Sequence, residues 1–296
     1  NTAHGAYALY LNTTGTENTA VGKASLCANT TGADNVAIGV ESLQKNTTGS
    51  NNVATGKISL NQNTTGSSNI ATGRAALRYN TIGASNTAVG NAVLCSNTTG
   101  CFNTASGFES LRANTTANFN TAYGACTLFA NTTGANNVAV GYQALKSNTC
   151  AHRNTALGYQ AAKSTTSGYD NTIMGHRAYE VNTTGAHSVA IGSYSGYKNT
   201  TGCRNISIGS FSLYKPTTAH YNIAIGVCAQ CALNTTSGNI AIGFSALRHQ
   251  TGGGSNTAVG HVAMQYNTTG SGHTALGYEA LLANTTSHSN TAVGHQ

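Results

Sequence analysis

A repeat with a period of seventeen positions runs through the whole chain and restricts it to one kind of architecture. The motif Asn-x-Ala-x-Gly returns at this interval from Asn1 to Asn290, with a few substitutions, so that 296 residues hold seventeen full repeats and a short remainder. We number the repeat from 1 to 17, starting at this Asn. Position 5 is Gly in all 18 copies, position 3 is Ala in 16 of 18, and position 9 is Leu in 12 of 17. Tandem repeats of constant length stack as a quasi-one-dimensional array.

The residue types within the repeat predict a β-solenoid. Seventeen residues are too few for a two-helix repeat, which needs about 33. Val, Ile and Thr at positions 1 to 5 favour a strand that ends at the Gly. We expect a second short strand over positions 7 to 10, with a short helix over positions 6 to 11 as the alternative. Asn-Thr-Thr-Gly at positions 12 to 15 is typical of a turn in which Asn and Gly supply positive φ.

The predicted fold class is therefore all-β: a parallel β-solenoid with seventeen residues per coil and about seventeen coils. At ~4.8 Å per coil the coils would make a rod about 80 Å long. We expect a single continuous domain over residues 1–296, less regular between about 160 and 250, where Leu at position 9 and Asn at position 12 are replaced in several repeats. Small and apolar residues would form ladders inside the coil; the first members of this core ladder are Ala3, Gly5, Leu9, Ala20, Gly22 and Leu26.

Positions 2 and 4 point away from the Ala at position 3, because side chains alternate along a strand. Position 2 is nevertheless Thr, Val or Ile, and position 4 is mostly aliphatic, as in Val21, Ile38 and Ile191. A strand that is apolar on both faces is usually buried on both. This pattern predicts either self-association along the strand face or an exposed Thr/Val array with a function.

Several segments resemble repeats of known fibrous proteins. Asn-Thr-Ala-Val-Gly at Asn18–Gly22, with the closing Asn-Thr-Thr-Gly at Asn29–Gly32, resembles repeat arrays of phage tail fibres and bacterial surface proteins. Val-Ala-Ile-Gly at Val36–Gly39 is similar to the heads of trimeric autotransporter adhesins. Those heads are left-handed β-rolls of three chains with a shorter repeat. The resemblance implies a fibre and, as one arrangement, a trimer.

The Asn-Thr-Thr turn is also a sequon for N-glycosylation. One interpretation is a ladder of Asn amides hydrogen-bonded between coils; the other is a spine of glycans on outward-pointing Asn side chains. The Asn at position 1 is interpreted as a structural ladder. The candidate glycosylation sites are Asn12, Asn29, Asn46, Asn63, Asn97, Asn114, Asn131, Asn182, Asn199, Asn234, Asn267 and Asn284.

Composition argues against an enzyme. Charged residues are 7% of the chain, with seven acids and 14 Lys and Arg, against about a quarter in ordinary domains. Glu17 and Asp34, at position 17 of successive repeats, are a weak glycosidase signal at best. The cations are too dispersed for nucleic-acid binding, and without about 18 consecutive apolar residues no membrane insertion is expected. The chain starts within a repeat and without Met, so we expect a mature segment or a fragment.

Cysteine and histidine do not cluster by repeat position. Of the eight Cys, Cys95 with Cys101 and Cys228 with Cys231 are the pairs within one coil, and no Cys recurs at the same position in adjacent coils. Most of the Cys are interpreted as small buried residues. No set of His falls at one position in adjacent repeats. We therefore predict no metal site, no catalytic residue and no cofactor other than covalent N-linked glycans.

The sequence favours a non-enzymatic structural protein of an extracellular, cell-surface or virion-surface fibre. Its expected partners are copies of itself, side by side or end to end, and glycans. The alternative is the shaft of an adhesin or tail fibre that binds a receptor glycan. Ice binding through positions 2 and 4 is less favoured, because Val36, Val53 and Ile70 interrupt the Thr residues.

Overall fold

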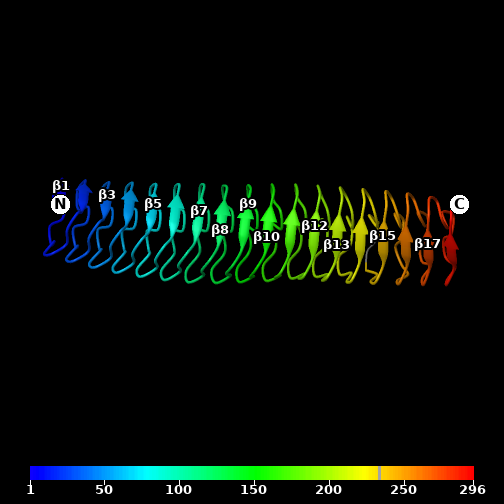
Figure 1. The fold of residues 1–296 in the computed structure, drawn as a ribbon. Coiled ribbons are helices and arrows are strands. Elements are labelled where there is room, and N and C mark those ends of the chain that lie inside the picture. Colours follow the sequence, from blue (N-terminus) through cyan, green and yellow to red (C-terminus); the bar gives the residue numbers. More distant parts are fainter. Residues whose placement is uncertain (233–234) are drawn as a thin grey trace. The chain divides into compact units, whose positions relative to one another are not determined.

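The computed structural model describes residues 1–232 and 235–296, in two compact units, Asn1–Cys150 and Ala151–Gln296. Each unit carries nine three-residue strands, one per coil (Figure 1). The strands of the first unit are β1 (Thr2–His4), β2 (Thr19–Val21), β3 (Val36–Ile38), β4 (Val53–Thr55), β5 (Ile70–Thr72), β6 (Thr87–Val89), β7 (Thr104–Ser106), β8 (Thr121–Tyr123) and β9 (Val138–Val140). Those of the second unit are β10 (Thr155–Leu157), β11 (Thr172–Met174), β12 (Val189–Ile191), β13 (Ile206–Ile208), β14 (Ile223–Ile225), β15 (Ile240–Ile242), β16 (Thr257–Val259), β17 (Thr274–Leu276) and β18 (Thr291–Val293).

Within each unit the strands pair in parallel and without a shift in register. Ala3 lies opposite Ala20 between β1 and β2, and Ile223 lies opposite Ile240 between β14 and β15. Each residue thus meets its equivalent in the next repeat. The predicted parallel β-solenoid with one repeat per coil is confirmed in both units, and the described residues contain no helix.

The expected second strand over positions 7 to 10 is wrong: these residues form turns. Positions 7 and 9 have positive φ, 55° at Ala24 and 48° at Leu26, and such residues cannot continue an extended strand. The backbone is still satisfied between coils. Ala24 N–H donates to Ala6 O at 2.8 Å, and Leu26 N–H donates to Ser42 O at 3.0 Å.

The Asn-Thr-Thr-Gly segment is a turn, but its positive φ lies elsewhere than expected. Position 17 carries it, with 57° at Asp34, whereas Asn29 and Gly32 are not in this region. The Gly has a steric cause instead. A Cβ on Gly32 would lie 2.6 Å from Asn29 Oδ1 and 2.9 Å from Asn46 Nδ2. At position 5 the backbone conformation itself requires Gly, because Gly22 has a φ of 129°, which other residues rarely adopt.

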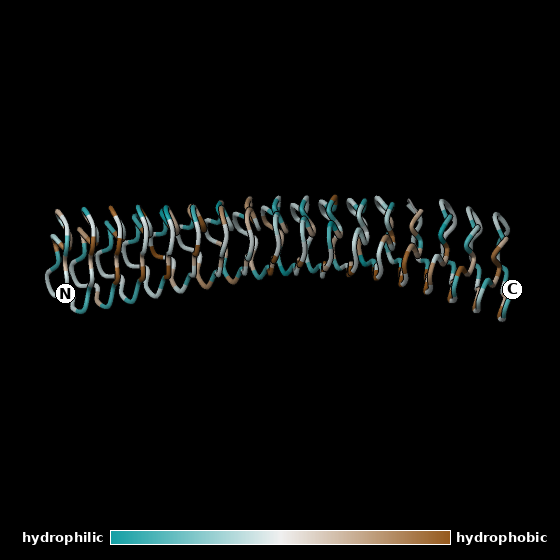
Figure 2. The backbone as a smooth tube through the Cα atoms, turned by 90° about the horizontal axis from the view of Figure 1, so that it is seen from above, coloured by the Kyte–Doolittle hydropathy of each residue, from teal (hydrophilic) through white to brown (hydrophobic). Residues whose placement is uncertain are grey.

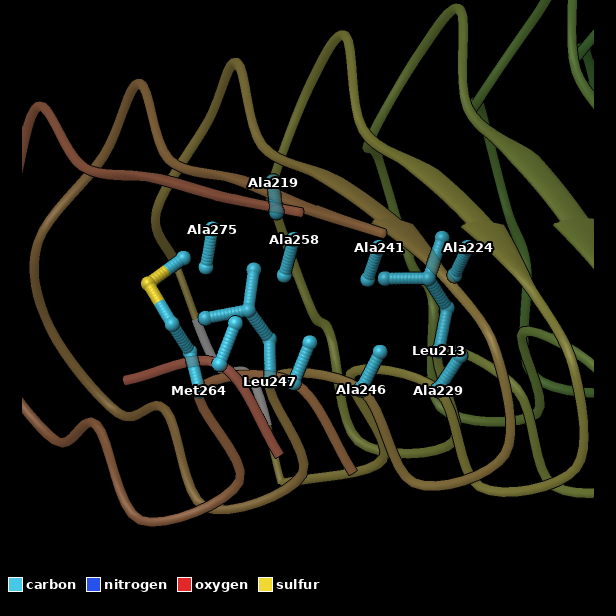
Figure 3. Packing of buried hydrophobic residues seen from close by; sticks show 12 residues of the cluster. Leu213, Ala219, Ala224, Ala229, Ala241, Ala246, Leu247, Ala258, Met264 and Ala275 are labelled. Atoms are coloured by element: carbon cyan, nitrogen blue, oxygen red, sulfur yellow. The ribbon is translucent and has the colours of Figure 1, made fainter. Parts of the chain in front are cut away.

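Apolar side chains fill the interior of each coil. Ala20 and Leu26 are fully buried and Gly22 is half-buried, while Ala3 and Gly5 of the first coil are exposed and Leu9 is half-buried. In the second unit, Leu213, Leu247 and Met264 reach across the coil toward the strand alanines (Figure 3). Apolar and polar segments recur from coil to coil within each unit (Figure 2).

The less regular repeats between about 160 and 250 keep the strand register from β10 to β15. A large side chain compensates for small neighbours at one of the places where Leu is lost. Tyr179 is buried at position 9, and the next coil has Gly196 there, against which the Tyr ring packs. Leu233 and Asn234, two of the departures noted in the sequence, lie outside the described residues.

Candidate functional site

Two Asn ladders fix each coil on the next. At position 1, Asn35 donates from its backbone N–H and from Nδ2 to Asn18 Oδ1, both at 3.0 Å, and from Nδ2 to Gly49 O at 2.9 Å. At position 12, Asn46 Nδ2 donates to Asn29 Oδ1 and to Gly49 O, both at 2.8 Å. Both ladders therefore converge on the carbonyl at position 15. Buried amides that are satisfied in this way specify the register between coils.

Residues that replace Asn in the ladders reproduce part of its bonding. His273, at position 1, lies with Nε2 2.7 Å from Ser287 O and accepts the Asn290 N–H on Nδ1 at 3.0 Å. Thr165, at position 12, accepts Asn182 Nδ2 on its hydroxyl at 3.3 Å. The ladder function therefore tolerates side chains other than Asn, provided that they place polar atoms at the same points.

The structure places most of the predicted glycosylation sites inside the solenoid. Asn12 and Asn284 are half-buried, and Asn234 lies outside the described residues. The amide nitrogen of Asn46 uses both of its hydrogens in the bonds given above, and N-glycosylation would replace one of them. Glycan attachment stays a prediction for all of these residues. Fully buried are Asn29, Asn46, Asn63, Asn97, Asn114, Asn131, Asn182, Asn199 and Asn267.

The outer face of the strands carries an uninterrupted apolar row in the second unit. Position 4 of its nine strands is aliphatic or Met throughout, from Leu157 to Val293, and position 2 is Thr, Val or Ile. These side chains are exposed or half-buried. In the first unit the row at position 4 is interrupted by His4, Thr55, Thr72, Ser106 and Tyr123. The two units therefore present chemically different strand faces.

The second unit also carries a column of stacked rings at position 6, on the turn side of the coil. Phe244 and His261 stack with centroids 5.2 Å apart, His261 and Tyr278 at 5.3 Å, and Tyr278 and His295 at 4.8 Å. Sequence reasoning missed this column because it searched for His in adjacent repeats, whereas His alternates here with Tyr. Ring faces that cover one another in this way stabilise the turn side of these coils.

No group of three or more His, Cys, Asp or Glu in residues 1–232 and 235–296 could hold a metal ion. All eight Cys are free thiols, and each is exposed or half-buried. The sequence predicts most of them to be small buried residues, and none of them is fully buried. Within the same ranges, no helix has the length and hydropathy needed to cross a membrane.

Comparisons with known proteins do not identify a relative. No family model matches the chain, and neither a curated protein nor a solved structure matches it. The class that the fold defines is thus a parallel β-solenoid with one repeat per coil and Asn-ladder turns.

Proposed function

We propose that this chain is a structural, non-enzymatic part of an extracellular or virion-associated fibre, and that copies associate side by side through the strand face of the second unit. The observation that carries the proposal is the row of aliphatic and Met side chains from β10 to β18, each of which is exposed or half-buried. Ile208 and Ile225 lie near its middle, each on a strand whose outward residues are half-buried in the single chain. Contiguous exposed apolar surface on a protein is typical of an interaction site.

A second copy of the same chain is the occupant that fits this face best. The face carries no charged side chain at positions 2 and 4, so association needs no complementary charge on a partner. Its ridges repeat at the strand spacing of ~4.8 Å. The side chains of another surface can fit between these ridges along the whole row only if they repeat at the same spacing. A second copy of this solenoid has that spacing.

The size of the face sets the expected strength. Nine strands at ~4.8 Å, with positions 2 and 4 about 7 Å apart, give a strip on the order of 300 Å². A standard stable interface buries about 800 Å² per partner. We therefore expect association that depends strongly on concentration. It should strengthen with the number of coils that carry this apolar row.

The experiment compares the natural chain with Ile208→Glu/Ile225→Glu by light scattering after gel filtration over a range of concentrations. The mass of the natural chain is expected to rise above the 30.1 kDa of the monomer with concentration, and more so in ammonium sulfate, which strengthens apolar burial. The double variant is expected to stay monomeric. Ser210→Glu, at position 6 of the same unit, is the matched control and should associate as the natural chain does. A monomer at every concentration, or equal association of the double variant, would contradict the proposal.

Glycans are a separate part of the proposed function. The mass of the denatured natural protein, compared with 30.1 kDa for the bare chain, reports whether any are attached. We expect Asn12 and Asn284 to be the sites most open to attachment in the folded chain, since they are the half-buried members of the set. Hexose-like additions that map instead to Asn46 or Asn63 would mean that these coils carry outward-pointing Asn side chains, in place of the ladder.

A further inference from the structure

Two thiols lie side by side in one turn of the second unit. Cys228 and Cys231 occupy positions 7 and 10 of the coil that contains β14. Cys231 N–H donates to Cys228 O at 3.3 Å, which closes a four-residue turn and brings the two Cα atoms within about 7 Å. Cys231 Sγ donates to Arg248 O of the next coil at 3.9 Å. A disulfide needs Cα atoms no more than about 7 Å apart, so the turn already has the required reach.

A cationic pocket adjoins the pair. It has a volume of about 240 Å³, and both Cys line it together with Lys215, Arg248 and His249. The aromatic rings of Phe211 and Tyr214 form the apolar part of its wall. No Asp or Glu is among the residues that line it. The pocket therefore favours a small molecule that carries negative charge and presents a group to the sulfur atoms.

We propose that Cys228 and Cys231 form an oxidisable dithiol that closes to an intrachain disulfide by exchange with a small anionic disulfide of the glutathione type, bound in this pocket. Thiolate of Cys228 attacks one sulfur of the small disulfide, and the first small thiolate leaves and takes up a proton. Cys231 then loses its proton and attacks Cys228 Sγ, which releases the second small thiol. Two protein thiols and one small disulfide thus become one protein disulfide and two small thiols.

The order of the two steps follows from the surroundings of the sulfurs. Burial, and then the neighbouring Cys228, raise the pKa of the Cys231 thiol to about 11, so little of it is thiolate at neutral pH. Cys231 therefore reacts second, where the attack is intramolecular and proximity offsets the low thiolate fraction. A high thiol pKa also makes a sulfur a poor leaving group. Reduction by attack on Cys228 Sγ is therefore expected to be slow, since Cys231 would then be the leaving group.

The first experiment treats the full chain with glutathione disulfide and maps the products by peptide mass spectrometry. The expected product is a Cys228–Cys231 disulfide, lighter than the reduced peptide by two hydrogen atoms. Cys231→Ser should stop the reaction at a glutathione adduct on Cys228. Cys95 and Cys101 form the matched control pair, because they also share a coil but lie at positions 10 and 16, and Cys101 Sγ donates to Thr99 O at 3.4 Å. No internal disulfide is expected between them.

The second experiment tests the pocket by rate. Lys215→Ala/Arg248→Ala should slow closure several-fold with the anionic glutathione disulfide at low salt, and the difference should fade at high salt as the charges are screened. Closure by the neutral 2-hydroxyethyl disulfide should slow less, because the loss of Arg248 then acts only through the pKa of the Cys231 thiol, which Arg248 lowers. The same fold-change in closure rate for both oxidants would contradict the anion site. Separate adducts on Cys228 and Cys231 that never close would overturn the dithiol itself, whatever the association experiment shows.

Discussion

At the scale of single residues, the solenoid depends on backbone conformations that its residue types conceal. Positions 7, 9 and 17 of almost every coil have positive φ, and most of these residues are not Gly. Position 9 holds Leu, Ala, Tyr, Gly, Gln or Met, but never Val, Ile or Thr. Positive φ alone does not explain this, because position 7 has a similar φ and accepts Ile58 at 53° and Val262 at 49°. At position 9 the side chain is also enclosed in the coil, so a branched Cβ has less room to adjust there.

The first prediction separates side-chain volume from backbone conformation at this position. Leu60 is fully buried with a φ of 47°. Leu60→Met, the residue found at Met264 with a φ of 49°, should cost less than about 1.5 kcal/mol. Leu60→Ile has the same volume but should cost more than Leu60→Met, because its branched Cβ crowds a backbone that is both left-handed and enclosed at this position. Amide hydrogen exchange in the surrounding coils measures both, and equal protection of the two variants would contradict the conformational argument.

At the scale of the coil, the repeat predicted far more than its individual motifs did. The constant period, Ala at position 3 and Val, Ile or Thr beside it were sufficient to predict the parallel strands and their register. The turn over positions 6 to 11 was harder to predict, because local hydrogen bonds such as Ser25 N–H to Gly22 O are combined with bonds between coils such as Leu26 N–H to Ser42 O. The paired use of Gly49 O by Asn35 and Asn46 could not be predicted either, because it brings positions 1 and 12 of one coil to the same carbonyl.

In the irregular repeats, a large side chain at position 9 of one coil can fill the space that small residues leave in the adjacent coils. Along position 9 the sequence runs Ala162, Tyr179, Gly196, which places one large side chain between two small ones. A Cβ on Gly196 would overlap the Tyr179 ring at Cδ2 and Cε2. The sequence predicts a less regular solenoid in this region, since each repeat taken alone has lost some of its characteristic residues. The loss of Leu in one coil is instead balanced by the side chain of its neighbour.

The second prediction uses this exchange. Gly196→Leu restores the commonest residue of position 9, yet it should destabilise the unit by about 3 kcal/mol, at the upper end of overpacking costs. The φ of 59° at Gly196 is close to that of Leu residues in other coils, so backbone strain is not the cause. Adding Tyr179→Leu should recover at least about 1 kcal/mol of this loss, as contacting residues couple. Urea unfolding of the two single variants and the double variant gives the coupling, and strict additivity would disprove the packing explanation.

At the scale of the whole molecule, the scarcity of charge makes stability largely independent of pH in the acid and neutral range. The chain has seven acids, and the pKa of Asp170 is lowered by its hydrogen bond to Arg153 at an exposed site. Such exposed pairs contribute little to folding. The stability that the Asp170–Arg153 pair contributes is complete above the ordinary pKa of Asp and is lost as the pH falls below it. The larger linkage between pH and folding lies at the alkaline end, in the second unit.

Tyr179 is one source of that alkaline sensitivity, alongside the Cys231 thiol. Burial raises the pKa of its phenol to about 12 from 10.0, so between these values the unfolded chain loses a proton that the folded chain keeps. The stability contributed by the neutral phenol is therefore complete below pH 10 and is lost as the pH rises toward 12. At pH 11 the loss should be about 1.4 kcal/mol, growing to about 2.7 kcal/mol above pH 12.

The third prediction isolates this term with Tyr179→Phe. The variant keeps the ring that fills the space beside Gly196, but it has no phenol to ionise. The drop in unfolding free energy between pH 9 and pH 11 should therefore be smaller in Tyr179→Phe than in the natural chain by about 1.4 kcal/mol. Tyr266→Phe, at an exposed ring that stacks on His249, should follow the natural profile, since the same other groups titrate in both chains. If Tyr179→Phe and Tyr266→Phe lose stability equally over this range, the buried phenol does not hold its proton and the packing of the ring between the coils is looser than the structure shows.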